Sequence, residues 1–152
     1  MDATAAGTSE SRGDLHVVRF VVPLPYPEED VWPSLATREG LRSWLAEADP
    51  LEPRLGGAVA LRWVDDPEAA AVAGTVTAWD VERIVEYSLS GDGGRVRFHL
   101  EPGEHGDRLA TVLRFTHGFH GSDALREERL AAWRDRFGRL AAALQDRPRA
   151  RL

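Results

Sequence analysis

A histidine near the end of the chain is the side chain best placed for acid–base chemistry. His117 lies in a segment with strand periodicity, on the same face as Leu109, Leu113 and Phe115, which we expect to be the inner face of a sheet. An imidazole buried at the mouth of a pocket can transfer protons near neutral pH, so His117 is the candidate catalytic residue. The alternative is a histidine that only hydrogen-bonds the backbone at a strand end. The residues alone leave both interpretations open.

Two other local patterns have simpler structural explanations. His117 and His120 are three residues apart, but they lack the carboxylate of an H-E-x-x-H pattern and have a glycine between them. We therefore predict no metal site. Ser122 and Asp123 lack the G-x-S-x-G pattern of a nucleophile elbow, and the start of a helix explains both residues.

The composition excludes several classes of enzyme. All 19 basic residues are arginine, and the chain contains neither lysine nor cysteine. Thiolate catalysis, disulfides and sulfur-ligated metals are excluded without cysteine, whereas Schiff-base chemistry and the phosphate-binding P-loop are excluded without lysine. No motif indicates a cofactor.

Charge and hydropathy limit the partners in the same way. The net charge of -6 opposes binding to a phosphate backbone, so we expect no nucleic-acid partner. No apolar run approaches the ~20 residues that span a bilayer, and the N-terminus does not resemble a signal peptide. We expect a cytoplasmic protein without a membrane-inserted segment.

Large aromatic side chains recur on the segments predicted to be strands and helices. Such residues line ligand cavities in many proteins, but they equally form packed cores. On the first interpretation the candidate ligand-binding residues are Trp44, Trp63, Trp79, Phe98, Phe115, His117, Phe119, Trp133 and Phe137.

The elements that must position these side chains follow from periodicity and from helix signals. Residues 15–22 form an apolar, β-branched strand, after which Pro27 begins a short helix that ends near Leu35. Thr37 caps a second short helix, which ends at the Asp49-Pro50 pair. Alternating segments then predict an antiparallel meander with strands at residues 58–64, 71–80, 84–90, 95–101 and 108–116.

A long helix is expected to close the chain. Ser122 caps it, and it runs to about Gln145, with apolar residues spaced three and four apart. We expect this helix to lie across a curved sheet with its charged residues on a solvated outer face. These charged residues are Arg126, Glu127, Arg129, Arg134, Asp135 and Arg136.

Together these elements predict one α+β domain at residues 15–145. It contains a curved antiparallel sheet of about six strands, two short helices and one long C-terminal helix packed across the sheet. Residues 1–14 are small and polar and are expected to form a flexible N-terminal tail. Residues 146–152 form an arginine-rich C-terminal tail.

Five phrases in this order resemble one known family. They are PEEDVWPSLATREGLRSWL at residues 27–45, GG-x-V-x-L-x-W at 56–63, G-x-V at 74–76, T-H-G-F at 116–119, and Trp133 in the long helix. The arrangement resembles the helix-grip fold of the SRPBCC (START-like) superfamily. The phrases resemble its subfamily of activators of heat-shock-protein-90 ATPase.

The resemblance implies a hydrophobic cavity between the sheet and the long helix, and hence three hypotheses. The leading one is a non-enzymatic protein that binds a small hydrophobic molecule or lipid in that cavity. The second is a co-chaperone-like module that contacts a chaperone. The third is a cyclase or hydrolase that works in the cavity through His117. Neither the ligand nor the oligomeric state follows from the sequence.

Overall fold

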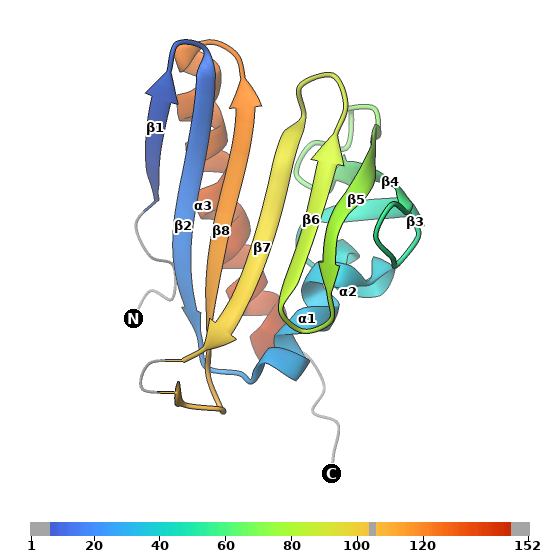
Figure 1. Ribbon diagram of the computed structural model, residues 1–152, viewed down its shortest axis with the longest axis vertical. Helices are drawn as coiled ribbons and strands as arrows, with labels where there is room; N and C mark the ends of the chain where they lie inside the picture. The colour runs from blue at the N-terminus through green and yellow to red at the C-terminus, as the bar shows by residue number, and fades with distance from the viewer. Residues whose placement is uncertain (1–6, 104–105, 147–152) are drawn as a thin grey trace.

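In the described part of the chain, an antiparallel sheet of eight strands forms one side of the molecule (Figure 1). The computed structural model describes residues 7–103 and 106–146. Along the sheet the strands lie in the order β1-β2-β8-β7-β6-β5-β4-β3. Their bounds are β1 (Thr8–Arg12), β2 (Leu15–Leu24), β3 (Ala46–Leu51), β4 (Ala58–Trp63), β5 (Val72–Asp80), β6 (Ile84–Leu89), β7 (Gly94–Pro102) and β8 (Thr111–His120).

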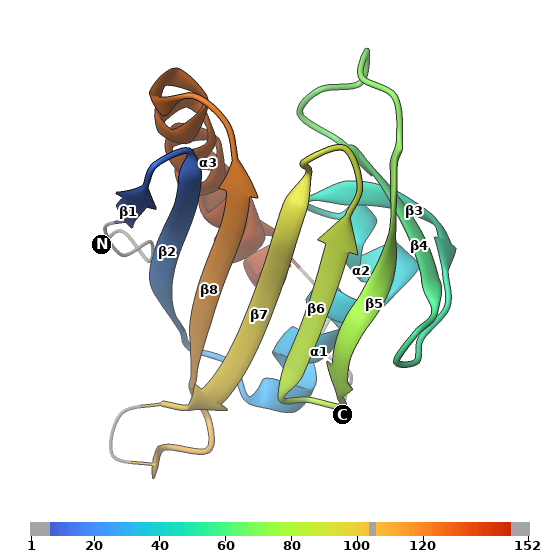
Figure 2. The same cartoon turned by 45° about the horizontal axis from the view of Figure 1, so that its top comes forward.

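The three helices of the described residues lie on the same face of the sheet (Figures 1 and 2). The helices α1 (Glu28–Ala36) and α2 (Arg38–Arg42) connect β2 to β3, and α3 (Asp123–Asp146) follows β8. The long helix α3 runs behind β2 and β8 in the view of Figure 1. This arrangement confirms the predicted α+β helix-grip architecture, with eight strands in place of about six.

Alternation of buried and exposed residues explains the central strands. In β2 the side chains of Val18, Phe20 and Val22 are buried, while their neighbours Arg19 and Val21 are exposed. The same alternation holds in β8, which pairs with β2 along its whole length. Period-two patterning therefore fixes which residues face the helices.

Two aromatic side chains donate hydrogen bonds to backbone carbonyls at the end of α1. The last carbonyls of a helix lack partners within the helix. Here the Trp44 Nε1–H donates to the Ser34 carbonyl and the Tyr87 hydroxyl donates to the Leu35 carbonyl, each at 2.8 Å. Burial raises the pKa of the Tyr87 hydroxyl, which therefore stays protonated.

The predicted N-terminal tail is wrong for Thr8–Arg12, which form β1 at one edge of the sheet. Two polar contacts between the β1 and β2 side chains accompany the backbone pairing. Arg19 donates to Glu10 at 2.6 Å, and the Ser11 hydroxyl lies 2.7 Å from the buried His16 ring. Residues 1–6 of the expected tail, and 147–152 of the arginine-rich tail, lie outside the described residues.

Two further expectations are wrong. The second short helix ends at Arg42, and residues 46–51 form the edge strand β3, in which the small side chains of Ala46 and Ala48 are buried. Leu109 does not share a face with His117, because β8 begins only at Thr111. The Leu109 side chain is 74% exposed.

We predict that Tyr87→Phe lowers the free energy of unfolding by about 1–2 kcal/mol, because the buried Leu35 carbonyl loses its hydrogen bond. Urea unfolding monitored by circular dichroism measures the change. Tyr26→Phe is the matched control, since Tyr26 also packs against the core and, among the described residues, only its backbone carbonyl accepts a hydrogen bond. Equal losses for the two variants would show that the hydrogen bond contributes nothing.

Candidate functional site

Eight of the nine predicted ligand-binding side chains meet in one cluster between the sheet and α3. Their ring centroids are separated by 4.3 Å for the closest pair, Phe115 and Trp133, and by 6.4 Å for Phe98 and Trp133. We call this set the aromatic cluster: Trp44, Trp63, Phe98, Phe115, His117, Phe119, Trp133 and Phe137. The ninth residue, Trp79, instead packs on Trp32 of α1, with 5.4 Å between the ring centroids.

Most members of the aromatic cluster are in contact with one another rather than with solvent. Trp44, Phe98, Trp133 and Phe137 are completely buried. Offset and edge-to-face contacts of this kind stabilise a core beyond the area they bury. Side chains therefore occupy the region where the resemblance implies a cavity, and a ligand-binding role for these buried rings stays a prediction.

His117 uses both ring nitrogens within this cluster. The Trp133 Nε1–H lies 3.0 Å from His117 Nδ1, and His117 Nε2 lies 2.6 Å from the Gly93 carbonyl oxygen. An indole nitrogen can only donate and a carbonyl can only accept, so the proton of the neutral ring must be on Nε2. Burial lowers the pKa of His117 to about 4. The imidazole is therefore neutral at pH 7.

This geometry matches the structural alternative that the sequence left open for His117. Its side chain faces inward, as predicted, and is 2% exposed. Proton transfer to a substrate would require breaking at least one of the two hydrogen bonds. The catalytic role of His117 stays a prediction, with this arrangement weighing against it.

The structure also shows where the other two local patterns lie, at the end of β8 and at the start of α3. His117 and His120 project from opposite faces of β8, because they are three residues apart on a strand, and so they cannot share a metal ion. The Ser122 hydroxyl accepts a hydrogen bond from the Leu125 N–H at 3.0 Å, as expected of a helix cap. Within residues 7–103 and 106–146, no group of three or more potential ligands could hold a metal ion.

A small pocket remains where α3 meets the sheet, beside the turn between β6 and β7. Its volume is about 160 Å³. We call it the mouth pocket, and it is lined by Trp63, Val72, Ser90, Gly91, Gly93, His117, Arg129 and Arg136. Trp63 and His117 were predicted as site residues, whereas the two arginines were expected on the solvated face of the helix. Arg129 lies four residues before Trp133, and Arg136 lies three residues after it. This helical spacing puts all three side chains on one face of α3, and it could have predicted that the arginines face the sheet.

Arg136 is held between two indole rings and a carboxylate. Its Cζ lies 4.4 Å from the ring centroid of Trp63 and 4.7 Å from that of Trp133. Its Nε–H and Nη2–H donate to the two carboxylate oxygens of Asp65, at 2.9 and 3.3 Å. Asp65 also accepts from Arg139 at 2.9 Å. Burial alone would raise the pKa of Asp65, but the two guanidinium groups outweigh it and lower the pKa.

Arg129 has no such partner among the residues that the structure describes. Its Nη1–H donates to the backbone carbonyl of Asp92 at 3.2 Å, and its Cζ lies 4.4 Å from the ring centroid of Phe119. No carboxylate of the described residues lies within 4.0 Å of its guanidinium. Burial lowers the pKa of Arg129, and this effect exceeds the opposing influence of the Asp92 carboxylate, which raises the pKa; the positive charge of Arg136 lowers it. The mouth pocket thus holds a half-buried cation that forms no direct ion pair with a described residue, although the Asp92 carboxylate acts on it from beyond 4.0 Å.

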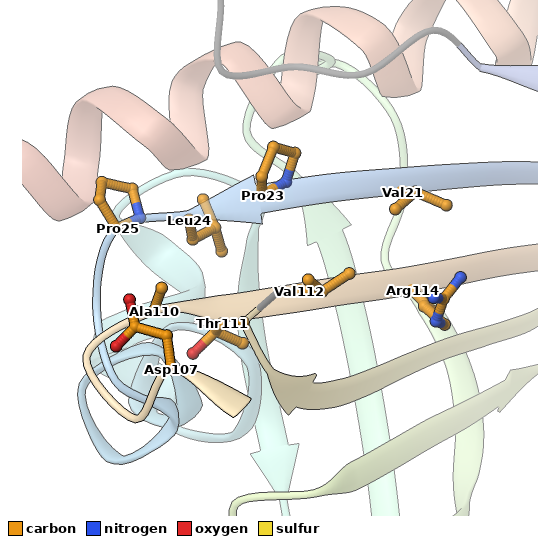
Figure 3. A pocket seen from close by; sticks show the side chains of 10 residues that line it. Val21, Pro23, Leu24, Pro25, Asp107, Ala110, Thr111, Val112 and Arg114 are labelled. Atoms are coloured by element: carbon orange, nitrogen blue, oxygen red, sulfur yellow. The ribbon is translucent and has the colours of Figure 1, made fainter. Parts of the chain in front are cut away.

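A second hollow lies on the outer face of the sheet, at the ends of β2 and β8 (Figure 3). Val21 and Val112 point outward here, because their neighbours Val22 and Leu113 are buried on the inner face. The hollow has a volume of about 670 Å³. We call it the outer groove, and it is lined by Val21, Pro23, Leu24, Pro25, Gly103, Asp107, Ala110, Thr111, Val112 and Arg114.

The buried imidazole makes the stability depend on pH. The pKa of His117 is about 4 in the folded protein and near 6.5 when exposed, so the unfolded chain binds the proton more tightly. We expect stability to fall as the pH is lowered from about 6.5 towards 4, by up to roughly 3 kcal/mol from this residue. Urea unfolding at several pH values measures the loss.

His117→Gln is expected to lose less stability than the wild type over this range, while His120→Gln, whose parent side chain is 59% exposed, keeps the wild-type slope. Equal slopes for all three proteins would contradict the prediction. Nuclear magnetic resonance titration of the wild-type imidazole gives a second measurement if His117→Gln does not fold. A ring that titrates near pH 6.5 in the folded protein would also contradict it.

Several solved structures share this fold with low sequence identity. CalU16 from Micromonospora echinospora has a TM-score of 0.71 at 17% identity, with 95% of this chain and 88% of that chain covered. The conserved protein of unknown function EF2215 from Enterococcus faecalis has a TM-score of 0.72 at 16% identity, covering 96% and 82%. The Aha1 dimer from Colwellia psychrerythraea has a TM-score of 0.63 at 19% identity, covering 86% and 96%.

Sequence comparison identifies the family. None of the curated proteins matches this chain. In the described part of the chain, no helix is both long and apolar enough to cross a membrane. The family model described as Activator of Hsp90 ATPase homolog 1-like protein matches residues 25–145. This match confirms the resemblance found in the sequence, and the chain belongs to the family of Activator of Hsp90 ATPase homolog 1-like proteins.

Proposed function

We propose that this protein is a cytoplasmic binding protein that holds a small ligand in the mouth pocket. The observation that carries the proposal is a pocket between the sheet and α3 that combines an aromatic wall with polar groups. Small-molecule sites typically have this composition, in which apolar walls supply contact area and a few polar groups fix the orientation. The pocket also lies in the region where the sequence resemblance implies ligand binding.

The size of the mouth pocket limits what it can hold. Its volume of about 160 Å³ is smaller than the roughly 300–1,000 Å³ of pockets that enclose drug-sized ligands. The rings beneath it are packed against one another, as the 4.3 Å separation of the Phe115 and Trp133 centroids shows. A whole lipid would have to displace these rings. We therefore propose a small ligand, or a ligand of which only one end enters.

The enzymatic alternative has less support. A cyclase or hydrolase acting through His117 needs a ring nitrogen that can reach the substrate. Trp133 and Gly93 occupy both nitrogens. We accordingly propose binding without turnover, and no cofactor is part of the proposal.

Filling the mouth pocket provides the test. We expect a thermal-shift screen of small aromatic compounds to yield ligands, each adding about 2.7 kcal/mol of stability at 100 times its Kd. Val72→Trp places an indole at the pocket wall and should abolish these shifts. Leu109→Trp is the control, because the Leu109 side chain is 74% exposed and lies outside the pocket. The absence of ligands, or ligands that stabilise Val72→Trp equally, would contradict the proposal.

The outer groove favours a second candidate function, a co-chaperone-like interaction with a protein partner. The groove has a volume of about 670 Å³ and presents the 41% exposed Val21 beside Pro23 and Pro25. An exposed apolar surface with a polar rim, here Asp107 and Arg114, is typical of protein interaction sites. The similarity to the Aha1 dimer is consistent with such a module.

If this second function is correct, the wild-type protein changes the ATPase rate of a bacterial Hsp90-type chaperone, and Val21→Asp abolishes the change by placing a charge in the groove. Leu15→Asp is the matched control, because Leu15 lies on the same strand, outside the groove, with 40% exposure against 41% for Val21. An ATPase rate that does not respond to the wild-type protein would exclude this function. Equal effects of both variants would exclude the groove as the contact.

A further inference from the structure

We infer that the ligand of the mouth pocket carries a carboxylate, which pairs with the guanidinium of Arg129. This inference rests on the proposed small-ligand binding and specifies the chemical class of the ligand. It is carried by the charge balance, the free hydrogen-bond donors and the walls of the pocket.

The charge balance around the pocket is positive, although the whole chain has a net charge of -6. Asp65 is the single carboxylate that pairs with Arg136 and Arg139. Arg129 adds a further positive charge, and no carboxylate of the described chain reaches within 4.0 Å of it. The Asp92 carboxylate on the turn accepts a hydrogen bond from the N–H of His120 and approaches the His120 ring, so it acts on Arg129 only from beyond 4.0 Å and does not occupy the Arg129 N–H groups. A half-buried site with this balance favours an anion.

The free donors point to the same conclusion. A guanidinium carries five N–H groups, and Arg129 uses one of them on the Asp92 carbonyl. Arg136 commits its Nε and Nη2 to Asp65, and its Nη1 makes no hydrogen bond to any residue that the structure describes. The planar fork of an arginine matches the two oxygens of a carboxylate. The mouth pocket is therefore lined by arginines with N–H groups that have no partner among the described residues.

The remaining walls indicate what is attached to the carboxylate. Trp63 and Val72 supply apolar surface, and Gly91 and Gly93 leave room because they have no side chains. Ser90, a neutral polar residue, also lines the pocket. A single unpaired guanidinium balances one negative charge, so a monoanion fits better than a dianion such as a phosphate ester. A small, flat carboxylic acid satisfies all of these features.

The test compares charged and neutral probes of one shape. Benzoate, benzamide and inorganic phosphate are titrated into the full chain at pH 7 and low salt. The chemical shift of the Trp63 indole N–H is followed by nuclear magnetic resonance. We expect benzoate to bind at least about tenfold more tightly than benzamide, since hydrogen bonds to charged groups are the stronger ones.

Variants assign the effect to Arg129. Arg129→Gln is expected to weaken benzoate binding at least about tenfold, and Arg129→Lys to restore part of it, because lysine keeps the charge but loses the planar fork. Arg134→Gln is the matched control, since Arg134 lies on the same helix with an exposed side chain. Thermal unfolding confirms that each variant is folded.

The outcomes separate this inference from the proposed function. Benzamide that binds as tightly as benzoate, or benzoate binding that survives Arg129→Gln, overturns the carboxylate and leaves a pocket for small neutral ligands. Phosphate that binds more tightly than benzoate in an Arg129-dependent way also overturns it. If benzoate does not bind, the inference fails, and the thermal-shift screen with Val72→Trp decides separately whether the pocket binds any ligand.

Discussion

The indole N–H of Trp133 imposes the constraint on which this structure depends. It is buried beneath α3, where an unpaired donor would cost about 1–3 kcal/mol. His117 Nδ1 accepts the hydrogen bond from this indole, and His117 Nε2–H donates a second one to the Gly93 carbonyl. The long helix, the strand β8 and the turn between β6 and β7 are thereby joined through one imidazole. The ring can serve in this way only while it is neutral, so burial and hydrogen bonding support each other.

The same contact positions the charged residues of α3. Once Trp133 faces the sheet, helix periodicity turns Arg129 and Arg136 towards it as well. Arg136 finds an aromatic sandwich and a carboxylate, which makes a buried cation tolerable. Arg129 finds an aromatic face and one carbonyl. The aromatic cluster and the mouth pocket are therefore two parts of one packing arrangement, the first apolar and the second charged.

Period-two and period-3.6 patterns were sufficient to predict the central strands, α3 and the inward orientation of His117. These patterns did not predict strands or buried side chains that depend on contacts with residues distant in the sequence. The segment of β1 has too few apolar residues to be predicted as a strand, and it is ordered by its pairing with β2. The burial of Arg136 depends on Asp65, which is distant in the sequence. Whether aromatic rings enclose a cavity or fill it depends on their mutual distances, which no linear pattern contains.

The strand order also affects the order in which the strand pairs form during folding. Every neighbouring pair in the sheet is adjacent in sequence except β2 and β8, whose pairing joins Leu15 to His120. Contacts between distant segments carry the largest loop-closure entropy and form slowly. The topology predicts that the β1–β2 hairpin, which is synthesised before β8, lacks its neighbouring strand until β8 has been made. During that interval both of its edges are open, and the charges of Glu10, Arg12 and Arg19 protect it from aggregation.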